Sequence, residues 1–199
     1  MTKHKDKKSE GFLSEWFALF CIVERYWSSL GGWRDIVKSP YIHIAIILTI
    51  CSINYWSATA WYSQVISVLP NLLGFGVTGY AIWIGWGDDR LKKLLKSSQN
   101  KISSDYLHVS AIFAHFCIVQ VISLTYAILA SIFSYEVNSE QLIGKILLWL
   151  NLSLSFFSSF NFFGGFIGFF LFIYAILTAL ETILALFRIS SWVDRLSED

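Results

Sequence analysis

Charged residues are scarce in this chain of 199 residues, and their scarcity excludes an ordinary soluble protein. Asp, Glu, Lys and Arg make up 15% of the sequence, against about a quarter in soluble domains. Hydrophobic residues make up 55%, aromatic residues 18%, and the mean hydropathy is +0.57. The composition predicts an integral membrane protein, and the long apolar runs predict that its fold is all-α.

Cysteine is also sparse. The three cysteines are an odd number without CxxC spacing, which argues against a disulfide framework or a zinc site. We interpret them as small core residues: Cys21, Cys51 and Cys117.

The familiar catalytic motifs are missing as well. The sequence contains no HExxH, no phosphate-binding loop and no paired carboxylates suited to catalysis. Gly74, Gly76 and Gly79 match GxGxxG on paper, but they lie within an apolar span rather than after a soluble strand. We therefore predict a protein that is not an enzyme and binds no cofactor or metal.

The basic residues are unevenly distributed. Fourteen of the fifteen Lys and Arg residues fall in residues 1–40, 88–106 and 188–199, and only Lys145 lies elsewhere. Because basic flanks of spans are retained in the cytoplasm, this pattern predicts an even number of crossings with both termini inside.

The N-terminal forty residues predict a surface segment ahead of the first span. Residues 1–10 are polar and basic, and we expect a disordered tail near anionic headgroups. Residues 11–38 are expected to form an interfacial amphipathic helix, because apolar side chains recur at helical steps over residues 12–27. Gly31 and Gly32 interrupt this pattern, and Ser39 and Pro40 predict the N-cap and first position of the next helix.

Residues 39–187 predict four transmembrane helices of about 20 residues each. We expect them at about residues 41–61, 70–87, 107–133 and 166–187, with the second opening at Pro70. Residues 88–106 then form a cytoplasmic basic loop, and residues 188–199 a cytoplasmic tail.

The apolar stretch over residues 142–187 is too long for one ordinary crossing. Two crossings would place the basic tail outside, so we expect one crossing, at residues 166–187. Residues 142–160 are then an outer-leaflet or interfacial helix, followed by a hinge at residues 161–165. Five crossings remain the alternative.

Four polar side chains fall at membrane depth, where they are functional candidates by default. Counting about 1.5 Å per residue places His115 and Glu181 in one layer. They could pair for proton relay or pH sensing. Alternatively, Glu181 could extend toward Arg188 or another cation at headgroup level, while His115 bonds a neighbouring helix. Asn54 and Gln120 form a second matched pair, which could join helices or line a narrow pore in an oligomer.

Small residues at four-residue spacing predict close helix packing, within one protomer or between copies. These faces consist of Gly74 with Thr78, Ala81 with Gly85, and Gly164 with Gly168. Basic residues outside the spans are expected to contact anionic lipid headgroups or a cytosolic protein rather than nucleic acid: Arg90, Lys92, Lys93, Lys96, Arg188 and Arg195.

Two functions fit this pattern. The first is a non-enzymatic, homo-oligomeric membrane anchor or sensor that presents a cytoplasmic surface to a soluble protein partner. The second is a small ion channel or proton-coupled pore lined by the polar residues of the spans. A transporter is disfavoured because the chain shows no internal repeat.

The basic N-terminus KHKDKK, the lysine-rich loop DDRLKKLLK and the short tail resemble the layout of the four-span membrane component of the bacterial Kiwa anti-phage defence system. The resemblance covers the whole chain and carries over no site residue. It implies a homo-oligomeric sensor of envelope disturbance, in the bacterial inner membrane, that recruits a soluble nucleic-acid-binding effector.

Overall fold

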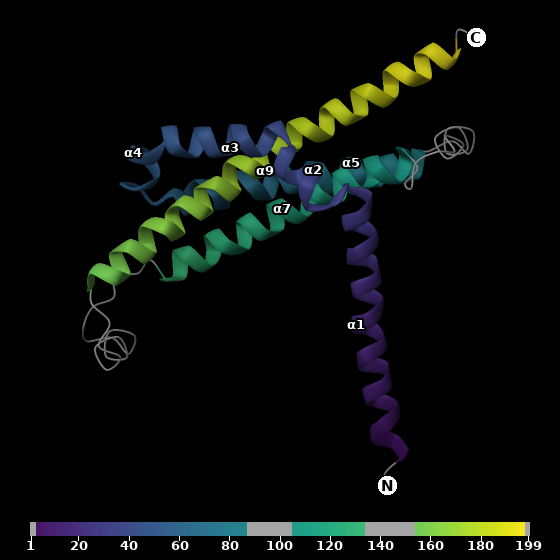
Figure 1. The fold of residues 1–199 in the computed structure, drawn as a ribbon, viewed down its shortest axis with the longest axis horizontal. Helices are drawn as coiled ribbons and strands as arrows, with labels where there is room; N and C mark the ends of the chain where they lie inside the picture. Colours follow the sequence, from purple (N-terminus) through teal and green to yellow (C-terminus); the bar gives the residue numbers. More distant parts are fainter. Residues whose placement is uncertain (1–2, 87–104, 134–153, 198–199) are drawn as a thin grey trace.

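A computed structural model describes residues 3–86, 105–133 and 154–197 of the chain (Figure 1). Every secondary-structure element in these ranges is a helix, so the all-α prediction is confirmed for the described residues. In chain order the helices are α1 (Lys3–Ser29), α2 (Gly32–Lys38), α3 (Pro40–Cys51), α4 (Ile53–Trp56), α5 (Trp61–Trp86), α7 (Asp105–Phe133) and α9 (Leu154–Ser197).

Helices α3, α5, α7 and α9 form a bundle in which α7 packs on α5 and α9, and α9 also packs on α3 and α5. Consecutive bundle helices run in opposite directions (Figure 1). The start of α3, the end of α5 and the start of α7 therefore lie toward one end, called here the junction end. Helix α9 is 44 residues long and continues past the other helices at that end.

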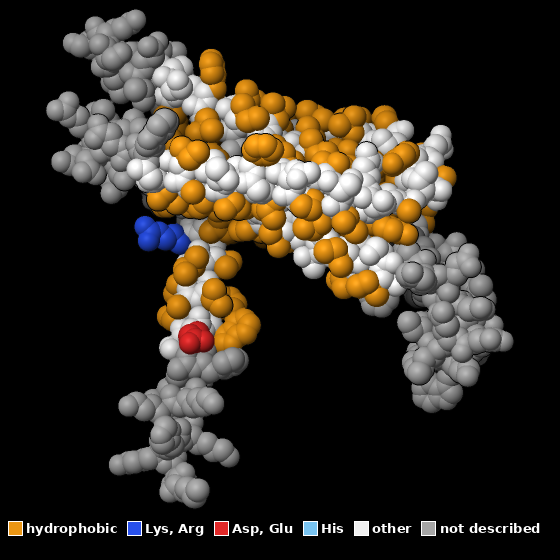
Figure 2. Space-filling view, turned by 180° about the vertical axis from the view of Figure 1, so that it is seen from behind, with side chains coloured by type: hydrophobic (Ala, Val, Ile, Leu, Met, Phe, Trp, Pro, Cys, Tyr) orange, Lys and Arg blue, Asp and Glu red, His pale blue; other side chains and the backbone are white. Residues whose placement is uncertain are grey.

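Three of these helices are long and apolar enough to cross a membrane. The apolar segments are Trp61–Gly85, Leu107–Ile132 and Phe162–Ser191. Exposed apolar side chains cover much of the bundle (Figure 2), as expected for a surface that faces lipid. Helix α7 coincides with the span expected at residues 107–133.

The first expected span, residues 41–61, is broken. Helix α3 has the predicted start, because Ser39 caps it by accepting a hydrogen bond from the Tyr41 backbone N–H and Pro40 occupies its first turn. It ends after 12 residues at Cys51, and the short helix α4 follows Ser52. The Trp56 indole N–H donates back to the Thr49 carbonyl over 2.9 Å, which stabilises this bend.

The second span begins earlier than expected. The prediction that it opens at Pro70 is wrong, since α5 begins at Trp61 and contains Pro70 within it. A proline inside a helix removes one backbone hydrogen bond, but packing against neighbouring helices can hold such a helix together in a membrane. Val65 and Leu69, beside Pro70, are fully buried in the bundle core.

The expected hinge at residues 161–165 is absent, because α9 is continuous from Leu154 to Ser197. Gly164 and Gly165 serve side-chain packing instead. The Tyr126 hydroxyl donates to the Gly164 carbonyl over 3.0 Å, and the Trp56 ring lies 3.2 Å from the position that a Gly165 Cβ would take. Most of the helix expected over residues 142–160 lies outside the described residues.

Helix α1 starts at Lys3, within the segment expected to be a disordered tail. Lys and Glu favour helices, and extending an existing helix requires no new nucleation. The helix expected over residues 11–38 is divided into α1 and α2 at Gly31 and Gly32, where the sequence pattern is interrupted. These glycines have φ angles of 85° and 74°, which residues with a side chain rarely adopt. Helix α1, which precedes this turn, projects from the bundle roughly perpendicular to the long axis of the bundle (Figure 1).

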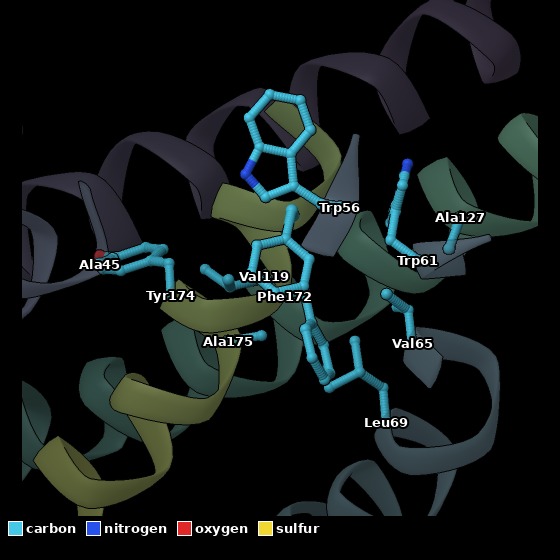
Figure 3. Close-up of a cluster of buried hydrophobic side chains, with 11 residues drawn as sticks. Ala45, Trp56, Trp61, Val65, Leu69, Val119, Ala127, Phe172, Tyr174 and Ala175 are labelled. Carbon is cyan, nitrogen blue, oxygen red and sulfur yellow. The ribbon is translucent and has the colours of Figure 1, made fainter. Parts of the chain in front are cut away.

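The core of the bundle is rich in aromatic side chains where α4 and α5 pack against α9. Figure 3 shows Trp56 and Trp61 with Phe172 and the smaller core residues. Trp61 lies directly over Gly168, where any added side chain would overlap its ring. Glycine at this position lets the indole of α5 approach the backbone of α9.

We predict that Gly168→Ala lowers the free energy of unfolding by about 1 to 3 kcal/mol, because the new methyl group overpacks the core against Trp61. Thermal unfolding of the purified protein in detergent measures the change. Gly74→Ala is the matched control, since no atom lies within 4 Å of the added carbon. Equal unfolding temperatures for the two variants would contradict this packing.

Candidate functional site

Helix α1 joins the bundle through its last turn, at two histidines of α7. The Tyr26 hydroxyl lies 2.7 Å from His115 Nδ1, and the Ser29 carbonyl lies 2.9 Å from His108 Nδ1. His108 and His115 are seven residues apart, so they share one face of α7, two turns from each other. We call these contacts, with their partners on α9, the α1 junction.

The first tier of the junction is a chain of three aromatic side chains from three helices. His115 Nδ1 bonds Tyr26 of α1, and its Nε2 lies 2.8 Å from the Tyr174 hydroxyl of α9. In either neutral tautomer one ring nitrogen donates and the other accepts, so one tyrosine accepts while the other donates. The histidine thereby connects α1 to the bundle core, where Tyr174 lies on the side away from Trp61 (Figure 3).

Burial raises the pKa of Tyr26 to about 12. Its hydroxyl therefore remains protonated across the physiological pH range and is available as a donor to His115. The Tyr26 ring also stacks on the imidazole, with ring centres 6.4 Å apart. The contact thus combines a hydrogen bond with apolar packing.

The second tier joins His108 of α7 to Ser29 of α1. The Ser29 carbonyl lies at the C-terminal end of α1, where helix carbonyls lack intrahelical partners, so His108 Nδ1–H donates to it. Glu181 of α9, seven residues after Tyr174, is partly buried. Both tiers connect α1 to α7, and the first tier also reaches α9 through Tyr174.

A small apolar cluster supports the junction from the side of α5. Val109, Phe113 and Ile189 are buried together, with Tyr80 and Trp83 of α5 packed against them. The Trp83 indole N–H donates to the Ser110 hydroxyl over 3.2 Å. The ends of α5, α7 and α9 are therefore packed together where α1 attaches.

The structure does not bring His115 and Glu181 together as a pair. Both ring nitrogens of His115 are occupied by tyrosines of other helices, Tyr26 of α1 and Tyr174 of α9. This agrees with the alternative expected from the sequence, in which His115 bonds a neighbouring helix instead of Glu181.

Asn54 and Gln120 are also separate. Asn54 is exposed on the short helix α4, whereas Gln120 is fully buried near the middle of α7. Neither amide atom of Gln120 has a hydrogen-bond partner in the described protein, and neither does the buried hydroxyl of Ser123, one turn away. These polar atoms lie deep in the bundle, where an unpaired group costs free energy.

The three small-residue faces differ in their surroundings. On α5, Gly74, Thr78, Ala81 and Gly85 are exposed, and no atom lies within 4 Å of an added carbon at either glycine. On α9, by contrast, Gly164 and Gly168 face aromatic side chains of the same protomer.

Of the basic residues predicted to contact a partner or lipid, Arg188 is exposed on α9. Arg195 falls in the last turns of the same helix, and its side chain is not among those described. The remaining four, Arg90, Lys92, Lys93 and Lys96, lie outside the described residues.

Sequence reasoning missed Tyr26, Tyr174, Ser29 and His108. One available signal was the hydroxyl of Tyr174, because a buried tyrosine usually has a hydrogen-bond partner. The spacing of His108 and His115 was a second signal, since seven residues place them on one helix face. No such rule identifies a backbone carbonyl such as that of Ser29.

The junction suits a mechanical or proton-sharing role. Among the described residues no group of three or more His, Cys, Asp or Glu side chains could hold a metal ion. The hydrogen bonds instead connect a projecting helix to two membrane-length helices.

No protein-family model, curated protein or solved structure matches this chain. Functional inference therefore rests on the geometry of the junction and on the sequence.

We predict that Tyr26→Phe loosens α1 from the bundle, because a lost hydrogen bond of about 1 kcal/mol shifts the equilibrium roughly fivefold. The interpretation of all three cysteines as core residues is wrong for Cys21 on α1 and Cys51 on α3, which are exposed. These two provide native spin-labelling positions in a Cys117→Ala background. The distance distribution between the labels should broaden in Tyr26→Phe and more so in His115→Phe.

Tyr55→Phe is the control for this experiment, since the Tyr55 hydroxyl donates to Gln64 away from the junction. It should leave the distribution unchanged. A narrow, wild-type distribution in His115→Phe would show that the two-tier contact does not position α1.

We predict that Gln120→Met raises the free energy of unfolding by about 1 to 3 kcal/mol, because it removes buried polar atoms that lack partners. Thermal unfolding tests this, with Gln64→Met as the exposed control. If Gln120→Met instead lowers the free energy of unfolding, the Gln120 amide has a hydrogen-bond partner in another copy or in bound water. That result would support the expected interhelical link.

Proposed function

We propose that this chain is a non-enzymatic, oligomeric membrane anchor or sensor whose α1 presents a cytoplasmic surface to a soluble protein partner. The observation that carries the proposal is the attachment of α1. Residues 14–25 of this helix are all exposed, and its last turn is held by hydrogen bonds to the bundle. A helix with this arrangement can bind a partner and still respond to movements of α7 and α9.

The proposed topology has four crossings, with α3 and α4 together as the first. Residues 40–56 extend about 25 Å at 1.5 Å per residue, slightly less than the hydrocarbon core of about 30 Å. The basic segments adjoin the junction end, so this end is assigned to the cytoplasm. Helix α1 then lies along the inner surface of a bacterial inner membrane.

On this surface the two faces of α1 have different roles. Trp16, Phe17 and Phe20 are exposed apolar residues that lie against lipid. Ala18 and Arg25, seven residues apart, lie on the other face of the helix and are turned to the cytosol. The partner surface is this second face, together with the last turns of α9.

Signal transfer would follow from the register of the two tiers. A tilt or rotation of α9 moves Tyr174, and His115 of α7 transmits that movement to Tyr26, while the His108–Ser29 bond keeps the end of α1 on α7. Such coupling requires the α1 junction to have two stable arrangements, and it requires a signal that shifts the population toward one of them. The layout shared with the Kiwa membrane component suggests envelope disturbance during phage infection as that signal.

The exposed small-residue face of α5 supports a homo-oligomer. Gly74, Thr78, Ala81 and Gly85 are exposed, and no described atom lies within 4 Å of a carbon added at Gly74 or Gly85. Small residues at this spacing allow helices of different copies to approach closely.

The alternative function is a small ion channel or proton-coupled pore. The unpaired polar atoms of Gln120 and Ser123 favour it, because polar groups deep in a membrane protein often mark a hydrated path. Within one protomer, however, Asn54 and Gln120 line no common path, since one is exposed and the other is enclosed.

We predict that a photo-crosslinking amino acid at Ala18 captures a soluble protein in intact cells, whereas the same group at Phe17 captures lipid. The two positions lie on different faces of α1, so they form a matched pair. His115→Phe should reduce the Ala18 product at least severalfold because it releases α1. The adduct is detected by gel shift and identified by mass spectrometry.

If the crosslinker at Ala18 captures no protein and the purified protein conducts ions in liposomes, the anchor function is rejected in favour of the pore. A product at Ala18 without flux would reject the pore.

A further inference from the structure

The corner between α1 and α2 carries two cations beside an open apolar groove. Trp33 and Val37 form one row on α2, and Arg34 and Lys38 form the next, because residues four apart share a helix face. All four are exposed, with Trp33 at 70% and Val37 at 55%. They line a groove of about 420 Å³.

The apolar wall of this groove continues onto α1. The rings of Trp27 and Trp33 meet edge to face, with centres 4.7 Å apart. A second groove of about 430 Å³ lies on α1, lined by Phe20, Val23, Glu24, Trp27 and Ser28. The two grooves thus share a tryptophan contact, and the α2 groove holds both cations and no acidic residue.

The corner lies at the point where the chain enters the membrane. Only Ser39 separates Lys38 from α3, so Lys38 is within about 8 Å of the first residue of an apolar helix. Tryptophan and basic residues are typical of this boundary.

We propose that the corner is a binding site for one anionic phospholipid. Arg34 and Lys38 contact the headgroup phosphate, and Trp33, Val37 and the α1 groove cover the upper part of an acyl chain. The paired cations match a negative headgroup, and the apolar wall matches a lipid rather than free phosphate. The proposal rests on the membrane topology proposed above, with α2 at the inner surface.

The test is native mass spectrometry of the full-length protein in detergent with equal amounts of phosphatidylglycerol and phosphatidylcholine. Wild type should retain phosphatidylglycerol preferentially. Each cation contributes about a fivefold preference, so the double variant Arg34→Gln with Lys38→Gln should lose more than tenfold. Arg34→Lys with Lys38→Arg keeps both charges and should keep the preference.

Arg25→Gln is the matched control, since Arg25 is an exposed cation of α1 outside both grooves. Trp33→Ala with Val37→Ala should weaken retention of both lipids, because it removes the apolar wall. Circular dichroism and gel filtration confirm that each variant remains folded.

Retention of phosphatidylglycerol by the double glutamine variant at the wild-type level would overturn the proposal. So would displacement of the lipid by millimolar inorganic phosphate, which would assign the cations to a soluble anion. The readout is lipid retention, so a failure here is distinct from failure of partner capture at Ala18.

Discussion

Close packing of aromatic rings against the glycines of α9 is the contact on which the bundle depends. Trp56 lies against Gly165, and Trp61 lies over Gly168. These two tryptophans flank the turn between α4 and α5, so their position sets both the end of the α3–α4 segment and the start of α5. The glycines are therefore packing positions in an unbroken helix.

The α1 junction depends in turn on that packing, because the rings that fix α9 also fix its register against α7. With this register, the Tyr174 hydroxyl lies within hydrogen-bond distance of His115. Hydrogen bonds in a low-dielectric interior are stronger than in water and are costly to leave unmade. The junction is thus suited to couple α1 to the bundle, as the proposed sensor requires.

Local patterns in the sequence predicted the features that depend on neighbouring residues. Ser39 and Pro40 mark the start of α3, and Gly31 with Gly32 ends α1, because capping and positive φ angles are local properties. The span at residues 107–133 was also clear from its apolar length. The hinge at residues 161–165 and the helix start at Pro70 were wrong, since both residue types break helices only where packing permits it.

The sequence by itself determined the all-helical class, the membrane-length apolar helices and the distribution of charge, because hydrophobicity and length are properties of each segment alone. Only the tertiary structure decided the partners of the polar residues. His115 bonds two tyrosines, His108 bonds the Ser29 carbonyl, and Gln120 is enclosed without a partner among the described residues. The physical reason is register: a shift of one or two turns between packed helices changes every pair across their interface.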